Sequence, residues 1–230
     1  MKKRREAIVW SVLLLVCVAI LYYSLFALEG KNYYVVSIAL ILSSIIMFLV
    51  RFENRSPSVA EISMIAVMCA LAIVARISFF AVPNIKPMAA LVIITGISLG
   101  AEAGFMTGML SAFVSNFYFM QGAHTPFQMF ALGVVGFFAG IVFSKVPVNK
   151  LSLSVYAIGA ILVLYGGIVD INTLYYSMGE NTLESIVTTY GLAFGFNLIH
   201  AISTAIFLMI LHKPILNKLT RVKVKYNLIR

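Results

Sequence analysis

The sequence predicts an all-α fold, a polytopic membrane helix bundle, and three observations support this class. Hydrophobic residues occupy 62% of the 230 positions and charged residues 11%, a composition that cannot provide the surface of a water-soluble domain. The hydrophobic residues are gathered in runs long enough for an α-helix to cross a hydrocarbon core of about 30 Å. The connections between these runs are short, so they leave no room for a separate soluble domain.

Eight apolar runs are expected to form the helices. The first follows the basic residues Lys2 to Arg5, as a signal peptide does, but its apolar part is about 20 residues long, whereas signal-peptide cores have about 7 to 15. We therefore interpret this run as a retained membrane helix. The expected helices are Ile8 to Leu28, Tyr34 to Val50, Val59 to Phe80, Met88 to Gly100, Ala103 to Phe119, Phe127 to Ser144, Leu151 to Val169 and Ile186 to Leu211.

These helices divide the chain into three expected parts. Residues 1–55 hold an N-terminal transmembrane helix pair, residues 56–212 form a membrane domain of six helices, and residues 213–230 form a basic tail. Because the tail is rich in lysine and arginine, we expect it to contact anionic lipid on the cytoplasmic side. A docking surface for a cytoplasmic partner is the alternative.

The stretch Met88 to Phe119 requires a choice between one membrane crossing and two. As a single helix its 32 residues would rise about 48 Å, which is too long for one crossing and too short for two full ones. With two crossings and the N-terminus inside, 14 lysine and arginine residues face the cytoplasm and 3 face outward, whereas one crossing gives 6 and 11. Two crossings are therefore predicted, which places both termini in the cytoplasm. The net charge of +9 then reflects membrane orientation and does not call for nucleic acid.

The outward connections carry the candidate binding residues. They are expected at Ala81 to Pro87, Met120 to Pro126 and Asp170 to Ser185, and they combine hydrogen-bonding groups with aromatic rings, as small-molecule pockets do. An ordinary polar loop with an interfacial aromatic belt is the alternative interpretation. Together with residues at the adjoining helix ends that would line the outer mouth, the candidate substrate-binding residues are Asn84, Lys86, Asn116, Tyr118, Gln121, His124, Thr125, Gln128, Asn172, Tyr175 and Tyr176.

Small residues recur every four positions on several expected helices. Such spacing places them near one helix face, where two backbones can approach closely. The repeats are Gly96, Gly100, Gly104 and Gly108, then Gly136 with Gly140, Gly191 with Gly195, and Ala66 with Ala70. They predict a tightly packed bundle, and for the alanine pair an exposed groove for another membrane subunit is the alternative to packing within the chain.

Several classes of activity lack their signatures. No G-x-x-x-x-G-K-[ST] motif occurs, so a P-loop ATPase is excluded. The three histidines, His124, His200 and His212, are expected at outer, middle and inner levels, so they do not predict a metal site or a catalytic centre. A proton-coupled carrier acting alone is disfavoured because Glu61, Glu102 and Asp170 are all expected near helix ends.

The order of elements from Val59 onward resembles the substrate-binding S component of energy-coupling factor (ECF) vitamin transporters. The resemblance rests on a first helix with an alanine-xxx-alanine motif, a proline-containing outer loop, a glycine-rich helical turn and three further helices. Residues 82–140, "VPNIKPMAALVIITGISLGAEAGFMTGMLSAFVSNFYFMQGAHTPFQMFALGVVGFFAG", are similar to the CbrT-type S components associated with cobalamin. The helices before residue 56 are an added pair relative to the usual six-helix S component.

The resemblance implies a multi-pass protein of a prokaryotic cell membrane, with no enzymatic activity and no cofactor. It would capture a vitamin, cobalamin first among the candidates, and deliver it with a transmembrane T component and two cytoplasmic ATPases. Ala66 and Ala70 match the motif that faces the T component in that family. Another vitamin is the alternative ligand. The scarcity of outer cations favours a large neutral molecule over a small anion.

Overall fold

The computed structural model describes residues 58–177 and 182–226, together with eight helical positions between residues 12 and 46. The expected N-terminal pair therefore lies outside the described residues, apart from those eight positions. The eight positions are Val12, Leu15, Val16, Ala19, Ala39, Leu42, Ser43 and Ile46.

The described part of the chain is helical and has no strand, which confirms the predicted fold class. Its elements are α3 (Val59–Ser78), α4 (Met88–Leu99), α5 (Ala101–Phe119), α6 (Thr125–Val142), α7 (Lys150–Gly159), the π-helix η1 (Ala160–Gly166), α8 (Gly167–Ser177) and α9 (Leu183–Lys225). Among the described helices, four are long and apolar enough to cross a membrane, namely Val59–Ser78, Thr125–Val142, the continuous Lys150–Leu174 and Leu183–Lys225. The protein is thus a multi-pass membrane protein.

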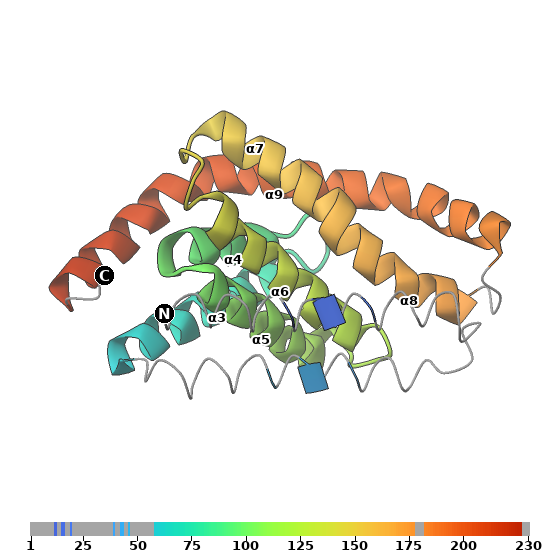
Figure 1. Ribbon diagram of the computed structural model, residues 1–230, viewed down its shortest axis with the longest axis horizontal. Helices are drawn as coiled ribbons and strands as arrows, with labels where there is room; N and C mark the ends of the chain where they lie inside the picture. Colours follow the sequence, from blue (N-terminus) through green and yellow to red (C-terminus); the bar gives the residue numbers. More distant parts are fainter. Residues whose placement is uncertain are drawn as a thin grey trace.

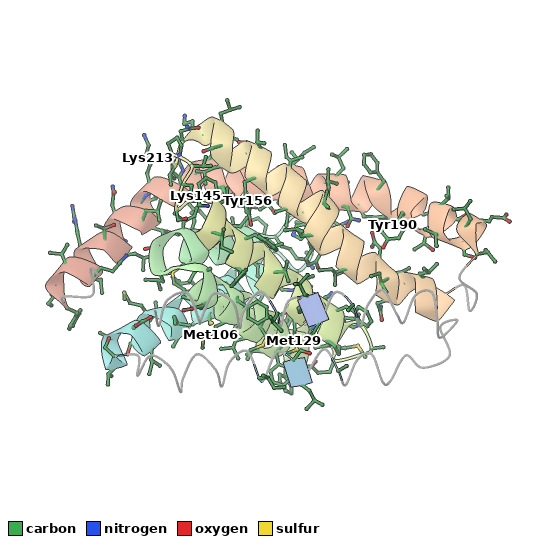
Figure 2. The ribbon with its side chains drawn as sticks, viewed as in Figure 1. Met106, Met129, Lys145, Tyr156, Tyr190 and Lys213 are labelled. Carbon is green, nitrogen blue, oxygen red and sulfur yellow. The ribbon has the colours of Figure 1, made fainter. Side chains whose placement is uncertain are left out.

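The helices run side by side, and the bundle has two distinct ends (Figure 1). The connections 79–87 and 120–124 form one end, which we call the cavity end. The Gly100 turn, the connection 143–149 and the C-terminal part of α9 form the other. We call it the basic end because it carries seven of the nine lysine and arginine residues in the described ranges, and Lys145 and Lys213 mark it in Figure 2.

Helix α4 lies at the centre of the bundle and contacts α3, α5, α6 and α9. Every residue from Met88 to Gly96 is buried, so this helix is apolar on all sides and has no lipid-facing stripe. Its 12 residues span about 18 Å, which is shorter than the hydrocarbon core, and the surrounding helices supply the rest of the thickness. As predicted from the charge count, α4 and α5 are two helices, and they meet at Gly100, whose φ of 99° suits glycine.

Glycines bring α4, α5 and α6 into backbone contact. A Cβ added at Gly136 of α6 would lie 2.3 Å from the carbonyl oxygen of Gly104, and one at Gly96 would lie 2.2 Å from the carbonyl oxygen of Gly136. The predicted close packing is present on these three helices. It is absent at Gly191 and Gly195 of α9, where nothing within the described residues lies within 4 Å of an added Cβ.

Two helices are longer than the sequence predicts. The expected loop Asp170 to Ser185 is helical as far as Ser177, because α7, η1 and α8 form one continuous rod. The last helix was expected to end at Leu211 and instead continues to Lys225, with Pro214 inside it. Its 43 residues extend about 65 Å, so the basic segment as far as Lys225 is a helix and not an irregular tail. Lys223 Nζ donates to the Ser98 carbonyl oxygen at 2.8 Å, which attaches this segment to the end of α4.

Candidate functional site

A cavity of about 240 Å³ lies between α3, the connection 79–87, α4, α6, the η1–α8 rod and α9. Its polar groups come from elements far apart in the sequence, so the site exists only once the bundle has assembled. Its lining consists of Arg76, Asn84, Lys86, Met88, Ala89, Gln128, Leu132, Tyr165, Val169, Asn197 and His200.

Arg76 is the buried cation of this cavity. It lies in the last turn of α3 and is 8% exposed. Its Nη1 donates to Ser115 Oγ at 2.5 Å and to Asn116 Oδ1 at 2.8 Å, both on α5. The guanidinium carbon also lies 4.5 Å from the ring centroid of Phe119. Neutral groups therefore fix the position of the guanidinium at the cavity wall.

Asn116 connects this arginine to α6. It is fully buried, and its Nδ2 donates to Thr125 Oγ1 at 3.1 Å and to Gln128 Oε1 at 3.0 Å. One amide on α5 thus bonds to groups on two other helices, α3 and α6, and Gln128 extends the network to the cavity lining.

The connection 79–87 covers the cavity with two polar side chains. Asn84 has a φ of 60°, a left-handed conformation that asparagine tolerates better than most residues. Lys86 Nζ lies 4.8 Å from the centroid of the same Phe119 ring that Arg76 contacts. Burial, and then the positive charge of Arg76, lowers the pKa of Lys86 below its ordinary value. The two cations therefore face the same small volume.

The opposite wall comes from η1, α8 and α9. Tyr165 lies in the π-helical turn, and its ring packs edge-on against His200, with centroids 4.9 Å apart. Asn197 donates from Nδ2 to Asp170 Oδ2 at 2.7 Å, which ties α9 to α8 beside the cavity. π-Helical turns are frequent at functional sites because they shift side chains out of the regular α-helical register. Here the π-helical turn places the ring of Tyr165 in the cavity wall.

The structure places the predicted binding residues at different depths. Asn84, Lys86 and Gln128 line the cavity, and Asn116 and Thr125 are buried behind them. His124 is partly buried before α6, and burial followed by the Arg76 charge lowers its pKa. Tyr118 is 55% exposed, and Gln121 is exposed and donates a hydrogen bond to the Phe113 carbonyl oxygen. Asn172 lies on α8, and its Oδ1 has no hydrogen-bond partner in the described residues. Tyr175 and Tyr176 belong to α8, but their side chains lie outside the described part of the chain.

Comparison with known proteins identifies the family. The family model described as "ECF-type riboflavin transporter, S component" matches residues 56–221, well over half of the chain. This chain belongs to that family. No curated protein and no solved structure gave a match. The resemblance to ECF S components is thereby confirmed, but the narrower cobalamin type is not, because the matching family is described by riboflavin.

Four polar or aromatic cavity residues of this S component were not among the predicted site residues: Arg76, Tyr165, Asn197 and His200. Two sequence signals pointed toward them. His200 and Asn197 are polar residues within an expected membrane helix, which marks functional candidates, although such residues also form hydrogen bonds between helices. Arg76 is one of the three cations that the charge count assigns to the outer side, which gives its level in the membrane but not its contacts. Tyr165 gives no such signal, because a tyrosine near a helix end is common in membrane proteins.

Ala66 and Ala70, the predicted partner motif of the S component, lie on an exposed face of α3. Their neighbours Met64, Ile65, Met68 and Cys69 are buried, so the alanine pair does not pack within the described bundle. The alternative of packing against another helix of the described bundle therefore does not apply, and among the described residues nothing covers this face.

Replacing Asn116 of this S component with leucine is expected to lower the free energy of unfolding by about 1–3 kcal/mol or more, because Arg76 and Gln128 would lose a buried partner. The matched control is Gln121→Ala, since that side chain forms one exposed hydrogen bond and its loss should change stability by less than about 0.5 kcal/mol. Thermal unfolding in a single detergent measures both. Equal stability of the two variants would show that the network contributes nothing.

Proposed function

We propose that this S component captures a compact vitamin at the cavity end, which faces the outside of the cell. The orientation is supported by the distribution of lysine and arginine, because cytoplasmic loops of membrane proteins carry the excess of these residues. Within the described ranges seven lie at the basic end and two, Arg76 and Lys86, at the cavity end. Both termini are then cytoplasmic.

The observation that carries the proposal is the cavity itself. It combines side chains of Arg76, Lys86, Gln128 and Asn197 with the rings of Tyr165 and His200 inside a membrane domain. Polar groups at such a depth are costly unless they serve a ligand, a partner or each other. A few convergent polar groups on an otherwise apolar wall are what a small-molecule site requires.

The size of the cavity bears on the choice of vitamin. About 240 Å³ lies just below the range of roughly 300–1,000 Å³ that is usual for drug-sized ligands, so the volume favours a compact ligand. Riboflavin, the vitamin named in the description of the family, is accordingly the first candidate. The expectation of a large neutral ligand rested on the scarcity of outer cations, and the convergence of Arg76 and Lys86 removes that reason.

Cobalamin is the second candidate, and one observation favours it. Large apolar side chains are exposed at the cavity end, with Phe80 62%, Tyr118 55% and Met120 78% exposed. A ligand too large for the cavity could insert one edge and rest its ring on these side chains. The same side chains also suit an aromatic belt at the membrane surface.

Delivery of the vitamin requires an energy source outside this chain, because the sequence has no P-loop. We propose a T component and two ATPases as partners, as the ECF family membership suggests. The exposed Ala66 and Ala70 face is the proposed contact with the T component. An apolar groove of about 910 Å³ lies beside it between α3 and the C-terminal part of α9, where Val67, Leu71 and Leu219 are among its walls. Together they offer a continuous surface for a membrane helix.

The test is equilibrium binding to the detergent-purified chain alone, measured by calorimetry with riboflavin, cobalamin and thiamine. We expect riboflavin to bind with one site per chain and without ATP, because capture precedes the energised step. Binding of cobalamin in place of riboflavin would assign the second candidate. If a monodisperse, folded preparation binds no vitamin, the capture function is wrong and a carrier driven by an ion gradient takes its place.

A further inference from the structure

The cavity holds two cations without a matching anion. Arg76 is 8% exposed and Lys86 is partly buried, and in the ranges that the structure describes no carboxylate forms an ion pair with either. The nearby buried acid, Asp170, accepts a hydrogen bond from Asn197 at 2.7 Å and is not part of the cavity lining. Positive charge therefore predominates where the ligand would lie.

Within the described residues, only one of the three nitrogens of the Arg76 guanidinium donates a hydrogen bond. Both of its hydrogen bonds leave from Nη1, toward Ser115 and Asn116. The N–H groups on Nη2 and Nε have no acceptor among the described residues, although Arg76 lines the cavity. The free donors of a guanidinium match two oxygens of a carboxylate or phosphate, which arginine binds in a bidentate manner.

The neutral partners of the two cations do not replace an anion. Ser115, Asn116 and the face of Phe119 hold Arg76 in place, and Phe119 also attracts Lys86, but none carries a full negative charge. Two like charges that share a small, partly dehydrated volume repel each other, and an anion between them would remove this cost. The arrangement is therefore one that a bound anion completes.

We propose that the substrate of this S component carries a carboxylate or a phosphate, and that Arg76 and Lys86 bind this group while the rest of the molecule packs against Tyr165, His200 and Leu132. The inference rests on the proposed capture function and narrows its substrate class to anions. Neutral riboflavin would then bind, but more weakly than an anionic derivative of it or an acidic vitamin.

The test compares matched neutral and anionic ligands on the purified full chain by calorimetry. One pair, riboflavin and riboflavin 5′-phosphate, tests for a phosphate, and the other, nicotinamide and nicotinate, tests for a carboxylate. The anionic member of at least one pair is expected to bind about tenfold to a hundredfold more tightly, as charge-assisted hydrogen bonds allow. Its affinity should also fall as salt concentration rises, whereas the affinity of the neutral member should not.

Two substitutions attribute the preference to the named cations. Arg76→Gln and Lys86→Gln should each reduce the affinity for the anion about tenfold while leaving that for its neutral counterpart within about threefold. Arg221→Gln, which removes a cation at the basic end, is the matched control and should change neither. Lys86 lies in a connection and not in a helix, so its variant remains informative if Arg76→Gln does not fold.

The outcomes separate this inference from the proposed function. Equal affinity within each pair, or an anion preference that survives Lys86→Gln and any folded Arg76→Gln, overturns the inference while the vitamin-capture function stands. Failure of every neutral and anionic vitamin to bind the folded chain overturns both. A preference that these substitutions abolish supports both.

Discussion

Replacing Gly136 with leucine is expected to prevent recovery of folded protein, and replacing it with alanine is expected to lower the free energy of unfolding by about 1–3 kcal/mol or more. The reason is steric. An added Cβ at this position would lie 2.3 Å from the Gly104 carbonyl oxygen and 2.7 Å from Val92 Cγ1, so α6 would have to move away from α4 and α5. Since α4 lies at the centre of the bundle, the displacement would disturb the core on several sides. Thermal unfolding in detergent, with size-exclusion chromatography, measures the loss.

Gly191→Ala is the matched control for this prediction. Gly191 also lies within a helix, but an added Cβ there meets nothing within 4 Å among the described residues. Alanine is a better helix former than glycine by about 1 kcal/mol, so this variant should be as stable as the unaltered chain or slightly more so. If Gly136→Ala matches Gly191→Ala in thermal stability, the backbone contact of α4, α5 and α6 does not hold the bundle together.

This pair of glycines also shows how far the sequence can predict the fold. The four-residue spacing is the same in both regions, and it correctly indicates the close packing of α4, α5 and α6. It is misleading at Gly191 and Gly195, because spacing shows which residues share a face and not whether another helix covers that face. The end of the η1–α8 rod was misplaced for a related reason. Asn172 and several of its neighbours are polar or aromatic, which indicates a loop, but these residue types are also compatible with a helix.

The candidate site was partly predictable because depth in a membrane can be estimated from position in the sequence. Asn84, Lys86 and Gln128 were expected at the outer mouth, and they line the cavity. Which helix faces converge depends on the rotation of each helix about its axis, and no residue pattern fixes that rotation for Arg76 on α3 or His200 on α9. The π-helical turn that positions Tyr165 changes the register locally, which regular helical spacing does not reveal.

Replacing both Ala66 and Ala70 with tryptophan is expected to leave ligand affinity unchanged and to reduce ECF-dependent uptake at least about tenfold. Both alanines lie on the exposed face of α3, away from the cavity lining, so the larger rings should not alter the binding site. Small residues at helix interfaces in membranes allow close backbone approach, and two bulky rings would prevent it. Calorimetry on the purified chain measures the first quantity. Uptake by vesicles that contain the T component and both ATPases measures the second.

The control for a bulky ring at a lipid-facing position is Val155→Trp. Val155 is 63% exposed on α7, which lies across the bundle from α3, so its substitution should alter neither binding nor uptake (Figure 1). No helix of the described bundle covers the face of Ala66 and Ala70, so loss of uptake with unchanged ligand affinity would support contact of this face with another subunit. Unimpaired uptake by the double variant would place the T component elsewhere. In that case the apolar groove between α3 and α9 would become the next surface to alter, through Val67 and Leu219.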